Sequence, residues 1–317
     1  MENTAVHIKD LCKRYGDTTA LDAVGFTVAP AEMFGLIGPD GAGKTTLIRI
    51  LCSLMDPDDG ECRLLDISVA RHPEKVRRII GYMPQRFSLY PDLTVAENLR
   101  FFAGLFRVPK NEHRQRAREL LEFSRLTPFV KRRAGRLSGG MKQKLALSCA
   151  LIHTPRILIL DEPTTGVDPV SRREFWEILA RLKADGVTIL VSTPYMDEAE
   201  KCDRIALMHK GKVLTTGRAE DIAAGFPGTV FAVAGKDLTG LAAWFKHRLG
   251  PEQIRILGDR VQVNLFEHAR QDMDGLRREA LADGLSFESV ETRPAALEDA
   301  FIAMIAGREK RGHHVSS

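Results

Sequence analysis

The chain lacks several features that would place it in other protein classes. Nowhere in its 317 residues do 18 apolar residues follow one another, so no segment is expected to span a membrane as a helix. The opening residues, MENTAVHIKD, have no apolar h-region of a signal peptide. The five cysteines are odd in number and show no C-x-x-C spacing, which argues against a disulfide framework or a zinc site. We therefore expect a chain that works in the reducing cytosol.

Aromatic residues are also scarce, at 7% of the chain, and no aromatic platform interleaves with its basic clusters. The clusters at Arg71–Arg78 and Lys131–Arg136 could contact lipid headgroups or nucleic acid, or could be solvated surface. Without stacking residues nothing favours nucleic acid, and no nucleic-acid partner is expected. The net charge is only +4, and 44% of the residues are hydrophobic, enough for one large domain and a small one.

Residues 38–45 read GPDGAGKT, a glycine-rich loop whose backbone N–H groups can point inward at a polyphosphate. The apolar run before it suits a buried strand, and the run after it has helical spacing. Lys44 would neutralise phosphate oxygens, and Thr45 would bind Mg²⁺ through its hydroxyl. The alternative is a glycine-rich turn with an incidental lysine. The expected nucleotide-binding residues here are Gly38, Pro39, Asp40, Gly41, Ala42, Gly43, Lys44, Thr45 and Thr46.

A second motif, ILILDEP at 157–163, joins an apolar run to two carboxylates. Such a run fits a parallel strand whose C-terminal end opens on a ligand site. Asp161 would then hold the magnesium ion, and Glu162 would polarise the attacking water. Two acids after a strand could instead form a solvated turn. The phosphate loop upstream favours the site.

The pentapeptide LSGGM at 137–141 precedes a helix with one apolar face. Ser138, Gly139 and Gly140 would therefore lie at a helix N-terminus, where an anion binds favourably. Within one chain, this end would compete with the phosphate loop for the same ligand. The physical resolution is a dimer, in which each pentapeptide closes on the phosphate held by the other subunit.

In this order, the motifs resemble those of the ATP-binding cassette (ABC) family, most closely the separate ATPase subunits of bacterial ABC-type drug exporters. The resemblance spans about residues 5–306. It implies an ATPase that uses ATP with Mg²⁺, pairs with a second ABC ATPase chain, identical or different, and powers a separate integral membrane permease. It also implies a cytoplasmic location, peripheral on the inner face of the cell membrane.

The resemblance assigns roles to three further residues. Tyr15 matches the aromatic residue that stacks on adenine, although by itself it would be ordinary surface packing. Gln85, in GYMPQ, matches the glutamine that senses magnesium and faces the transport partner. Asp168 matches the aspartate that contacts the opposite subunit.

Two residues depart from the family pattern. Met141 replaces the usual glutamine of the pentapeptide, a substitution common in exporter-type members. Pro194, in STPYMDEAE, stands where the family has its switch histidine. Proline offers neither an imidazole nor a backbone N–H, so the contact from this position to the γ-phosphate is lost. The neighbours Thr193 and Tyr195 carry hydroxyl groups but stand out of register.

The order of segments predicts an α/β fold with a nucleotide-binding domain over residues 1–225. Short strands over 4–37 indicate an antiparallel β subdomain, and residues 86–155 an inserted helical subdomain. Strands alternating with helices indicate a RecA-like P-loop core with a parallel sheet. Those strands are expected at 157–161, 187–191 and 204–209.

A linker is expected at 223–228, where the sequence reads AAGFPG. The order β-α-β-β-α-β over 229–306 then predicts a small C-terminal ferredoxin-like α+β domain. The polar residues 307–317 are expected to form a disordered tail.

These observations favour an ATPase subunit that drives a membrane exporter of drugs or other hydrophobic compounds. A second hypothesis is a nucleotide-holding half of a heterodimer, because losing one donor to a transferring group typically costs on the order of 10²–10³ in rate. A third is an ABC protein that acts on ribosomes or DNA. The single cassette and the lack of a heptad insertion argue against that third hypothesis.

Overall fold

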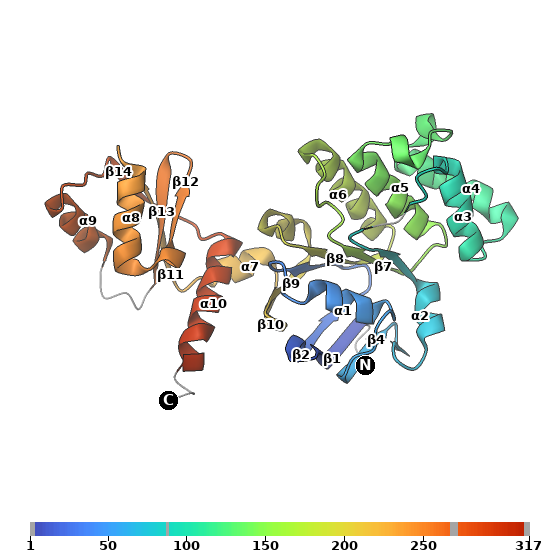
Figure 1. Ribbon diagram of the computed structural model, residues 1–317, viewed down its shortest axis with the longest axis horizontal. Helices are drawn as coiled ribbons and strands as arrows, with labels where there is room; N and C mark the ends of the chain where they lie inside the picture. Colours follow the sequence, from blue (N-terminus) through green and yellow to red (C-terminus); the bar gives the residue numbers. More distant parts are fainter. Residues whose placement is uncertain (1–3, 87–88, 267–271, 314–317) are drawn as a thin grey trace. The chain divides into compact units, whose positions relative to one another are not determined.

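The computed structural model describes residues 4–86, 89–266 and 272–313, and the chain divides into two compact units, Met1–Arg218 and Ala219–Ser317 (Figure 1). The strands of the first unit are β1 (Val6–Tyr15), β2 (Thr18–Val28), β3 (Met33–Ile37), β4 (Asp59–Leu64), β5 (Ile67–Ser68), β6 (Ile80–Met83), β7 (Ile157–Asp161), β8 (Thr188–Thr193), β9 (Arg204–His209) and β10 (Lys212–Gly217). Its helices are α1 (Lys44–Leu51), α2 (Pro73–Ile79), α3 (Val95–Leu105), α4 (Lys110–Phe123), α5 (Gly139–Leu151) and α6 (Pro169–Ala184), with short 3-10 helices η1 (Thr127–Phe129), η2 (Ala134–Arg136) and η3 (Met196–Lys201).

The central sheet of the first unit has the strand order β10-β9-β3-β8-β7-β6. All its pairs are parallel except the edge pair β9 and β10. Every residue of β3, β7 and β8 is buried, which explains why these strands read as continuous apolar runs rather than as alternating ones. Parallel strands end at one edge, so the segments that follow β3, β7 and β8 are brought together.

A second sheet, antiparallel, has the order β2-β1-β4-β5. Its buried face, with Phe26 stacked on Phe34 of β3 at 5.0 Å, joins one hydrophobic core with α1 and the central sheet. Strand β2 alternates buried and exposed residues toward its end, as expected for a sheet with one covered face.

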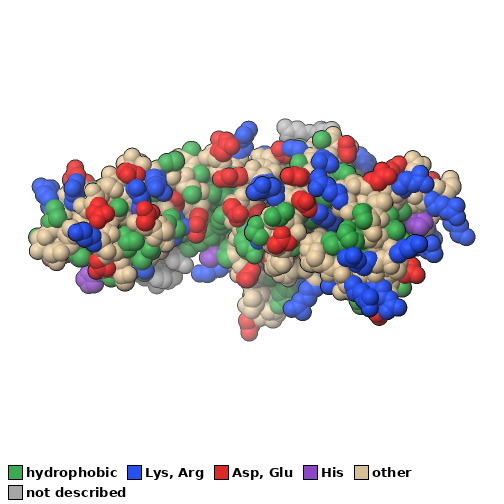
Figure 2. All heavy atoms as spheres, turned by 90° about the horizontal axis from the view of Figure 1, so that it is seen from above, with side chains coloured by type: hydrophobic (Ala, Val, Ile, Leu, Met, Phe, Trp, Pro, Cys, Tyr) green, Lys and Arg blue, Asp and Glu red, His purple; other side chains and the backbone are tan. Residues whose placement is uncertain are grey.

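The helices α3, α4 and α5 form the inserted helical subdomain, with their own hydrophobic core. Helix α3 begins with a capping box, in which Thr94 Oγ1 accepts from the N–H of Glu97 and the Glu97 carboxylate accepts from the N–H of Thr94. Residues 100–136 carry 11 Lys and Arg against three Asp and Glu. Figure 2 shows blue side chains gathered at this end of the first unit.

The second unit contains α7 (Ala219–Ala224), β11 (Gly228–Ala234), α8 (Leu238–Leu249), η4 (Pro251–Gln253), β12 (Ile254–Leu257), β13 (Arg260–Phe266), α9 (Met273–Ala282), β14 (Ser289–Arg293) and α10 (Leu297–His313). Its antiparallel sheet has the order β12-β13-β11-β14, so the chain runs β-α-β-β-α-β through a ferredoxin-like arrangement. Asp299, on α10, is 1% exposed and accepts hydrogen bonds from Gln262 Nε2 at 2.7 Å and Asn264 Nδ2 at 2.9 Å.

The predicted α/β class, with a RecA-like core, an antiparallel subdomain, helices inserted after β6 and a ferredoxin-like unit, is confirmed. Two expected boundaries differ. The division falls after Arg218 rather than at 225, because α7 packs against α10 of the second unit. The tail expected from residue 307 is helical as far as His313, since its two glycines, Gly307 and Gly312, cost a helix only about 1 kcal/mol each. Residues 314–317 lie outside the described part.

Candidate functional site

The phosphate loop, residues 38–45, connects β3 to α1. Gly43 has a φ of 102°, and a Cβ there would lie 2.6 Å from the carbonyl oxygen of Ala20 on β2. Only glycine avoids that clash and accepts that backbone. Helix α1 begins directly after it at Lys44, so the free N–H groups of its first turn and the positive end of its dipole face the loop. This is the geometry that binds phosphate at a helix N-terminus.

Lys44 points into this loop. Its Nζ donates to the carbonyl oxygens of Gly38 at 2.7 Å and Pro39 at 3.0 Å, and it lies 3.4 Å from Glu162 Oε1. The Lys44 and Glu162 side chains are 3% and 7% exposed, so each charge has its main partner in the other. A lysine held in this way is ready to exchange neutral carbonyl partners for anionic phosphate oxygens.

Asp161 ends β7 and lies beside the first turn of α1. Its Oδ1 accepts from Thr45 Oγ1 at 3.3 Å and from Ser192 Oγ at 2.6 Å, and the residue is 1% exposed. Burial, with the charge of Asp161 nearby, raises the pKa of the Cys52 thiol, so this group stays uncharged behind the site.

Glu162 follows in an unusual backbone conformation, with a φ of 49°. Its N–H donates to the backbone oxygen of Ser192 at 3.1 Å and to Ser192 Oγ at 3.0 Å. Its Oε2 accepts from Gln85 Nε2 at 2.8 Å. A non-glycine residue in this region of φ costs of order 1–3 kcal/mol and persists only where its surroundings fix it. The strand end β8, through Ser192, is what fixes it here.

The structure therefore brings together five of the predicted residues, Lys44, Thr45, Gln85, Asp161 and Glu162. It adds Ser192, which our sequence analysis did not single out. The sequence feature that could have indicated Ser192 is its position two residues before Pro194. In the structure it lies near the end of a strand that pairs with both β3 and β7.

Gly41, Ala42 and Tyr15 are among the other residues expected to bind the nucleotide. Gly41 has a φ of 77° in the turn, and Ala42 donates its N–H to Pro39 O at 3.2 Å. Tyr15 ends β1, is 45% exposed and donates its hydroxyl to Met55 Sδ at 2.9 Å. Its exposed ring face is compatible with stacking on a base, which stays a prediction, as does a role for Thr46.

The pentapeptide and Asp168 form a second cluster, at the starts of α5 and α6. Ser138 caps α5 by accepting from the N–H of Met141 at 3.3 Å, and Asp168 caps α6 by accepting from the N–H of Ser171 at 2.9 Å. A Cβ on Gly140 would lie 2.3 Å from Ser171 Oγ, so the two helix starts approach too closely for any other residue. The hydrogen bond from the Ser171 N–H lowers the pKa of the Asp168 carboxyl.

Pro194 is half-buried and directly follows β8. The preceding carbonyl, Thr193 O, accepts from the N–H of Gly38 at 3.4 Å, so this position lies beside the phosphate loop. The hydroxyl of Thr193 donates to Glu198 at 2.5 Å. The Arg172 guanidinium lies over the Tyr195 ring, with its Cζ 4.5 Å from the ring centroid. Neither neighbour directs its side chain to the site in place of the missing imidazole.

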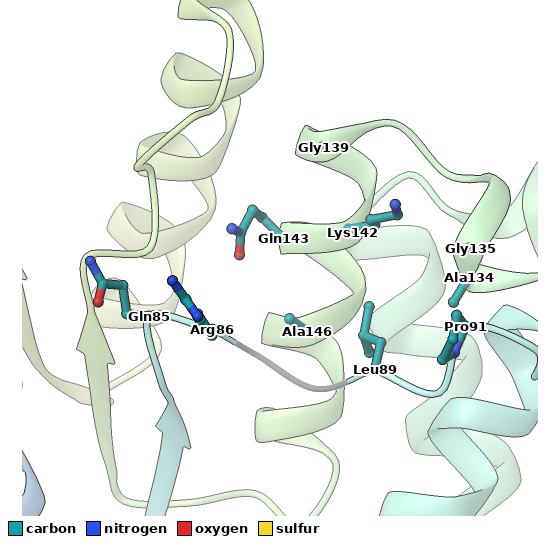
Figure 3. Close-up of a pocket in the computed structure, with 10 residues that line it drawn as sticks. All are labelled: Gln85, Arg86, Leu89, Pro91, Ala134, Gly135, Gly139, Lys142, Gln143 and Ala146. Carbon is teal, nitrogen blue, oxygen red and sulfur yellow. The ribbon is translucent and has the colours of Figure 1, made fainter.

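A cleft of about 330 Å³ opens beside Gln85, between the segment that follows β6 and helix α5. Figure 3 shows Gln85 and Arg86 on one side, with Lys142 and Gln143 projecting from α5 on the other. The whole lining is Gln85, Arg86, Leu89, Pro91, Ala134, Gly135, Gly139, Lys142, Gln143 and Ala146.

The ABC transporter family profile matches residues 21–165 of this chain. The chain is 38% identical, over 312 residues, to the probable multidrug ABC transporter ATP-binding protein YbhF of Escherichia coli, covering 97% of this chain but only 53% of YbhF. It thus spans about half the length of that relative. It is also 38% identical to the Nod factor export ATP-binding protein I of Paraburkholderia xenovorans, over 98% of this chain and 99% of that protein.

Among solved structures, the chain resembles the dimeric structure of MJ0796, a bacterial ABC transporter cassette. The TM-score is 0.62 at 30% identity, covering 67% of this chain and 98% of that one. Within the described ranges, no helix is long and apolar enough to cross a membrane. A near full-length relative at this identity, together with the phosphate loop, the paired acids and the fold, places the chain among the ATP-binding proteins of ABC transporters.

Proposed function

We propose that this chain binds and hydrolyses ATP to power export through a separate integral membrane permease, with drugs or other hydrophobic compounds as cargo. The observation that supports it most is the contact of Lys44, Glu162 and Gln85 at the edge where β3 and β7 end. There, Lys44 lies in the phosphate loop and the Glu162 carboxylate lies 3.4 Å from it, an arrangement that suits a bound γ-phosphate between the two groups and the attacking water.

The donor chemistry beside Lys44 fits a magnesium ion. Thr45 supplies a hydroxyl, Asp161 a buried carboxylate, and Gln85 an amide oxygen. Mg²⁺ prefers oxygen ligands and is usually held by only one or two carboxylates plus substrate phosphates. Among the described residues no cluster of three or more His, Cys, Asp or Glu side chains forms, which agrees with that mode. When bound, the ion would neutralise charge on the phosphates.

Each residue of the site then has its own role in the proposed reaction. Lys44 exchanges its carbonyl partners for β- and γ-phosphate oxygens, and Tyr15 stacks on the adenine. Glu162 accepts a proton from the attacking water, for which its position beside Lys44 and Gln85 is suited. Gln85, which bonds to Glu162 and lines the cleft, would report the state of the site to a partner seated there.

The second cluster supports the proposal that the chain dimerises. Ser138, Gly139 and Gly140 start α5, and Asp168 starts α6 beside them. We propose that these two helix starts close on the nucleotide held by a second ABC ATPase chain, and the likeness to a dimeric cassette supports this. The permease would sit at the cleft beside Gln85, which would place the chain in the cytoplasm, on the inner face of the membrane.

One observation favours a second candidate function. Pro194 lies next to Gly38 of the phosphate loop and brings no imidazole there. The chain would then be a nucleotide-holding half of a heterodimer, cleaving ATP slowly itself while its Ser138-Gly139-Gly140 segment completes the site of its partner.

Purification from detergent with the copurifying membrane protein separates these proposals. The first predicts ATP turnover by the complex that is stimulated by transported compounds and lost with Glu162→Gln. The second predicts that turnover survives that variant, because the partner chain provides the working acid. A chain that copurifies with no membrane protein and binds ATP without turnover would contradict both.

A further inference from the structure

A fully buried carboxylate lies outside the residues assigned so far. Glu198 is on η3, four residues after Pro194, and is 0% exposed. A buried carboxylate is costly unless hydrogen bonds satisfy it, so its donors identify what it holds in place. Those donors come from three separate segments.

The Glu198 network is formed by the side chains of Glu198, Thr164, Trp176 and Thr193. Glu198 Oε1 accepts from Thr164 Oγ1 at 2.7 Å and from Trp176 Nε1 at 3.1 Å. Its Oε2 accepts from Thr193 Oγ1 at 2.5 Å. At the rim of the network, Arg172 Nε lies 3.6 Å from Oε1.

Two of the donors, Thr164 and Thr193, belong to segments that carry candidate site residues, and Trp176 lies on α6. Thr164 lies in the β7–α6 loop, residues 162–168, which begins at Glu162 and ends at Asp168. Thr193 directly precedes Pro194, and its Oγ1 also accepts from the N–H of Tyr195 at 3.1 Å, so hydrogen bonds bracket the proline. We call residues 193–198 the Pro194 segment.

We infer that Glu198 is a positioning residue that ties the Pro194 segment to the β7–α6 loop, so that both keep one arrangement beside the phosphate loop. If the two segments separate, Oε1 of this buried carboxylate loses the Thr164 hydroxyl and keeps only Trp176 as a hydrogen-bond donor, and this cost favours movement of the two segments together. The inference rests on the proposed function for its effect on catalysis, but the coupling itself is a property of the fold.

The chain offers a matched control. Asp299 is a buried carboxylate in the second unit that likewise accepts from three side chains, Arg255, Gln262 and Asn264. Asp299→Asn makes the same chemical change as Glu198→Gln, away from the two segments. A global loss of stability caused by removing a buried charge would speed exchange in both variants alike.

The first measurement is hydrogen–deuterium exchange of the full chain, followed on peptides that cover 162–168 and 193–200. Glu198→Gln should speed exchange in both peptides, and Asp299→Asn in neither. Thr164→Val removes one donor from the loop, so it should speed exchange in the Pro194 segment as well, and should add little in the Glu198→Gln background. Faster exchange confined to the mutated segment would overturn the inference. Should Glu198→Gln not fold, Thr164→Val alone decides.

The second measurement is ATP turnover by the chain assembled with its copurifying membrane protein. Glu198→Gln should lower kcat by roughly 10- to 100-fold, as small misplacements of reacting groups do, with KM for ATP within about twofold of wild type. Unchanged kcat in a folded variant would contradict a positioning role. If the wild-type complex hydrolyses no ATP, the proposed function fails, while the exchange measurement still decides the coupling.

Discussion

The phosphate loop and the Pro194 segment follow neighbouring parallel strands, and the N–H of Gly38 donates to the carbonyl of Thr193. They differ in what they offer a nucleotide. The loop has a buried lysine and a helix N-terminus, whereas the Pro194 segment has a proline whose flanking groups are already hydrogen-bonded. Under the proposed function, this difference means that holding a nucleotide and cleaving it depend on separate segments, so one can change while the other is kept.

The largest effect is expected from Lys44→Ala. Removing one partner of a buried, hydrogen-bonded charge pair costs about 2–5 kcal/mol, or roughly 30-fold to several thousand-fold in affinity. ATP binding should therefore become undetectable in a titration with a fluorescent ATP analogue. Lys183→Ala, which removes a surface lysine paired with Asp203, is the control and should bind as wild type does. Near wild-type affinity in a folded Lys44→Ala chain would remove the phosphate-loop assignment.

Glu162→Gln should separate ATP hydrolysis from ATP binding. The amide keeps the volume but cannot accept a proton, so turnover should fall by about 10²–10⁴, the typical contribution of a general base. ATP affinity should stay near wild type, and an ATP-bound dimer should accumulate in size-exclusion chromatography. Unchanged turnover would mean that another group serves as the base.

Pro194→His should give the Pro194 segment a side chain that can contact the nucleotide, as the phosphate loop does under the proposed function. If an imidazole can reach the γ-phosphate there, single-turnover hydrolysis should rise by up to about 10²-fold, the typical worth of one preorganised donor. Pro194→Ala is the control, because it frees the backbone without adding the imidazole. Equal rates in all three proteins, with fast wild-type turnover, would show that another residue has taken the role.

The smallest effect concerns the cap of α6. Because the folded-state pKa of Asp168 is lowered from its ordinary value of 3.8, its carboxylate contributes stability that is present above that value and is lost as the pH falls through the folded-state pKa. Asn is also a good N-cap, so Asp168→Asn removes only the charge. Wild type should melt slightly higher than the variant at pH 7, and the gap should close below pH 4. A pH-independent gap would mean that the charge contributes nothing.

Sequence reasoning could predict the core strands and the phosphate loop because their signals are local. The phosphate loop, which ends in Gly43-Lys44 between an apolar run and a helix, can be recognised from the sequence alone, because no distant contact defines it. The strands β7 and β8 were expected from their apolar runs, but the contacts of Ser192 with both Asp161 and Glu162 depend on the register in which the two strands pair. Register is a tertiary property.

The role of Glu198 could not be predicted from the sequence either, because its hydrogen-bond donors are brought to it only by the tertiary fold. Its donors Thr164 and Trp176 lie 34 and 22 residues away. A glutamate in a charged stretch such as MDEAEK is normally solvent-exposed, and no periodicity separates it from its neighbours. In the second unit, the limits of the last strand, Ser289–Arg293, are likewise set by its pairing with β11.

The left-handed backbone conformation of Glu162 opposes folding stability to catalytic activity. At a φ of 49°, glycine would relieve the conformation, and Asn would tolerate it better than Glu does. Variants selected only for heat resistance should therefore tend to lose the acid at this position, gaining a higher melting temperature as turnover disappears. A thermostability screen of a library at residue 162, read against hydrolysis, would measure how much folding stability the chain forgoes to keep a working carboxylate.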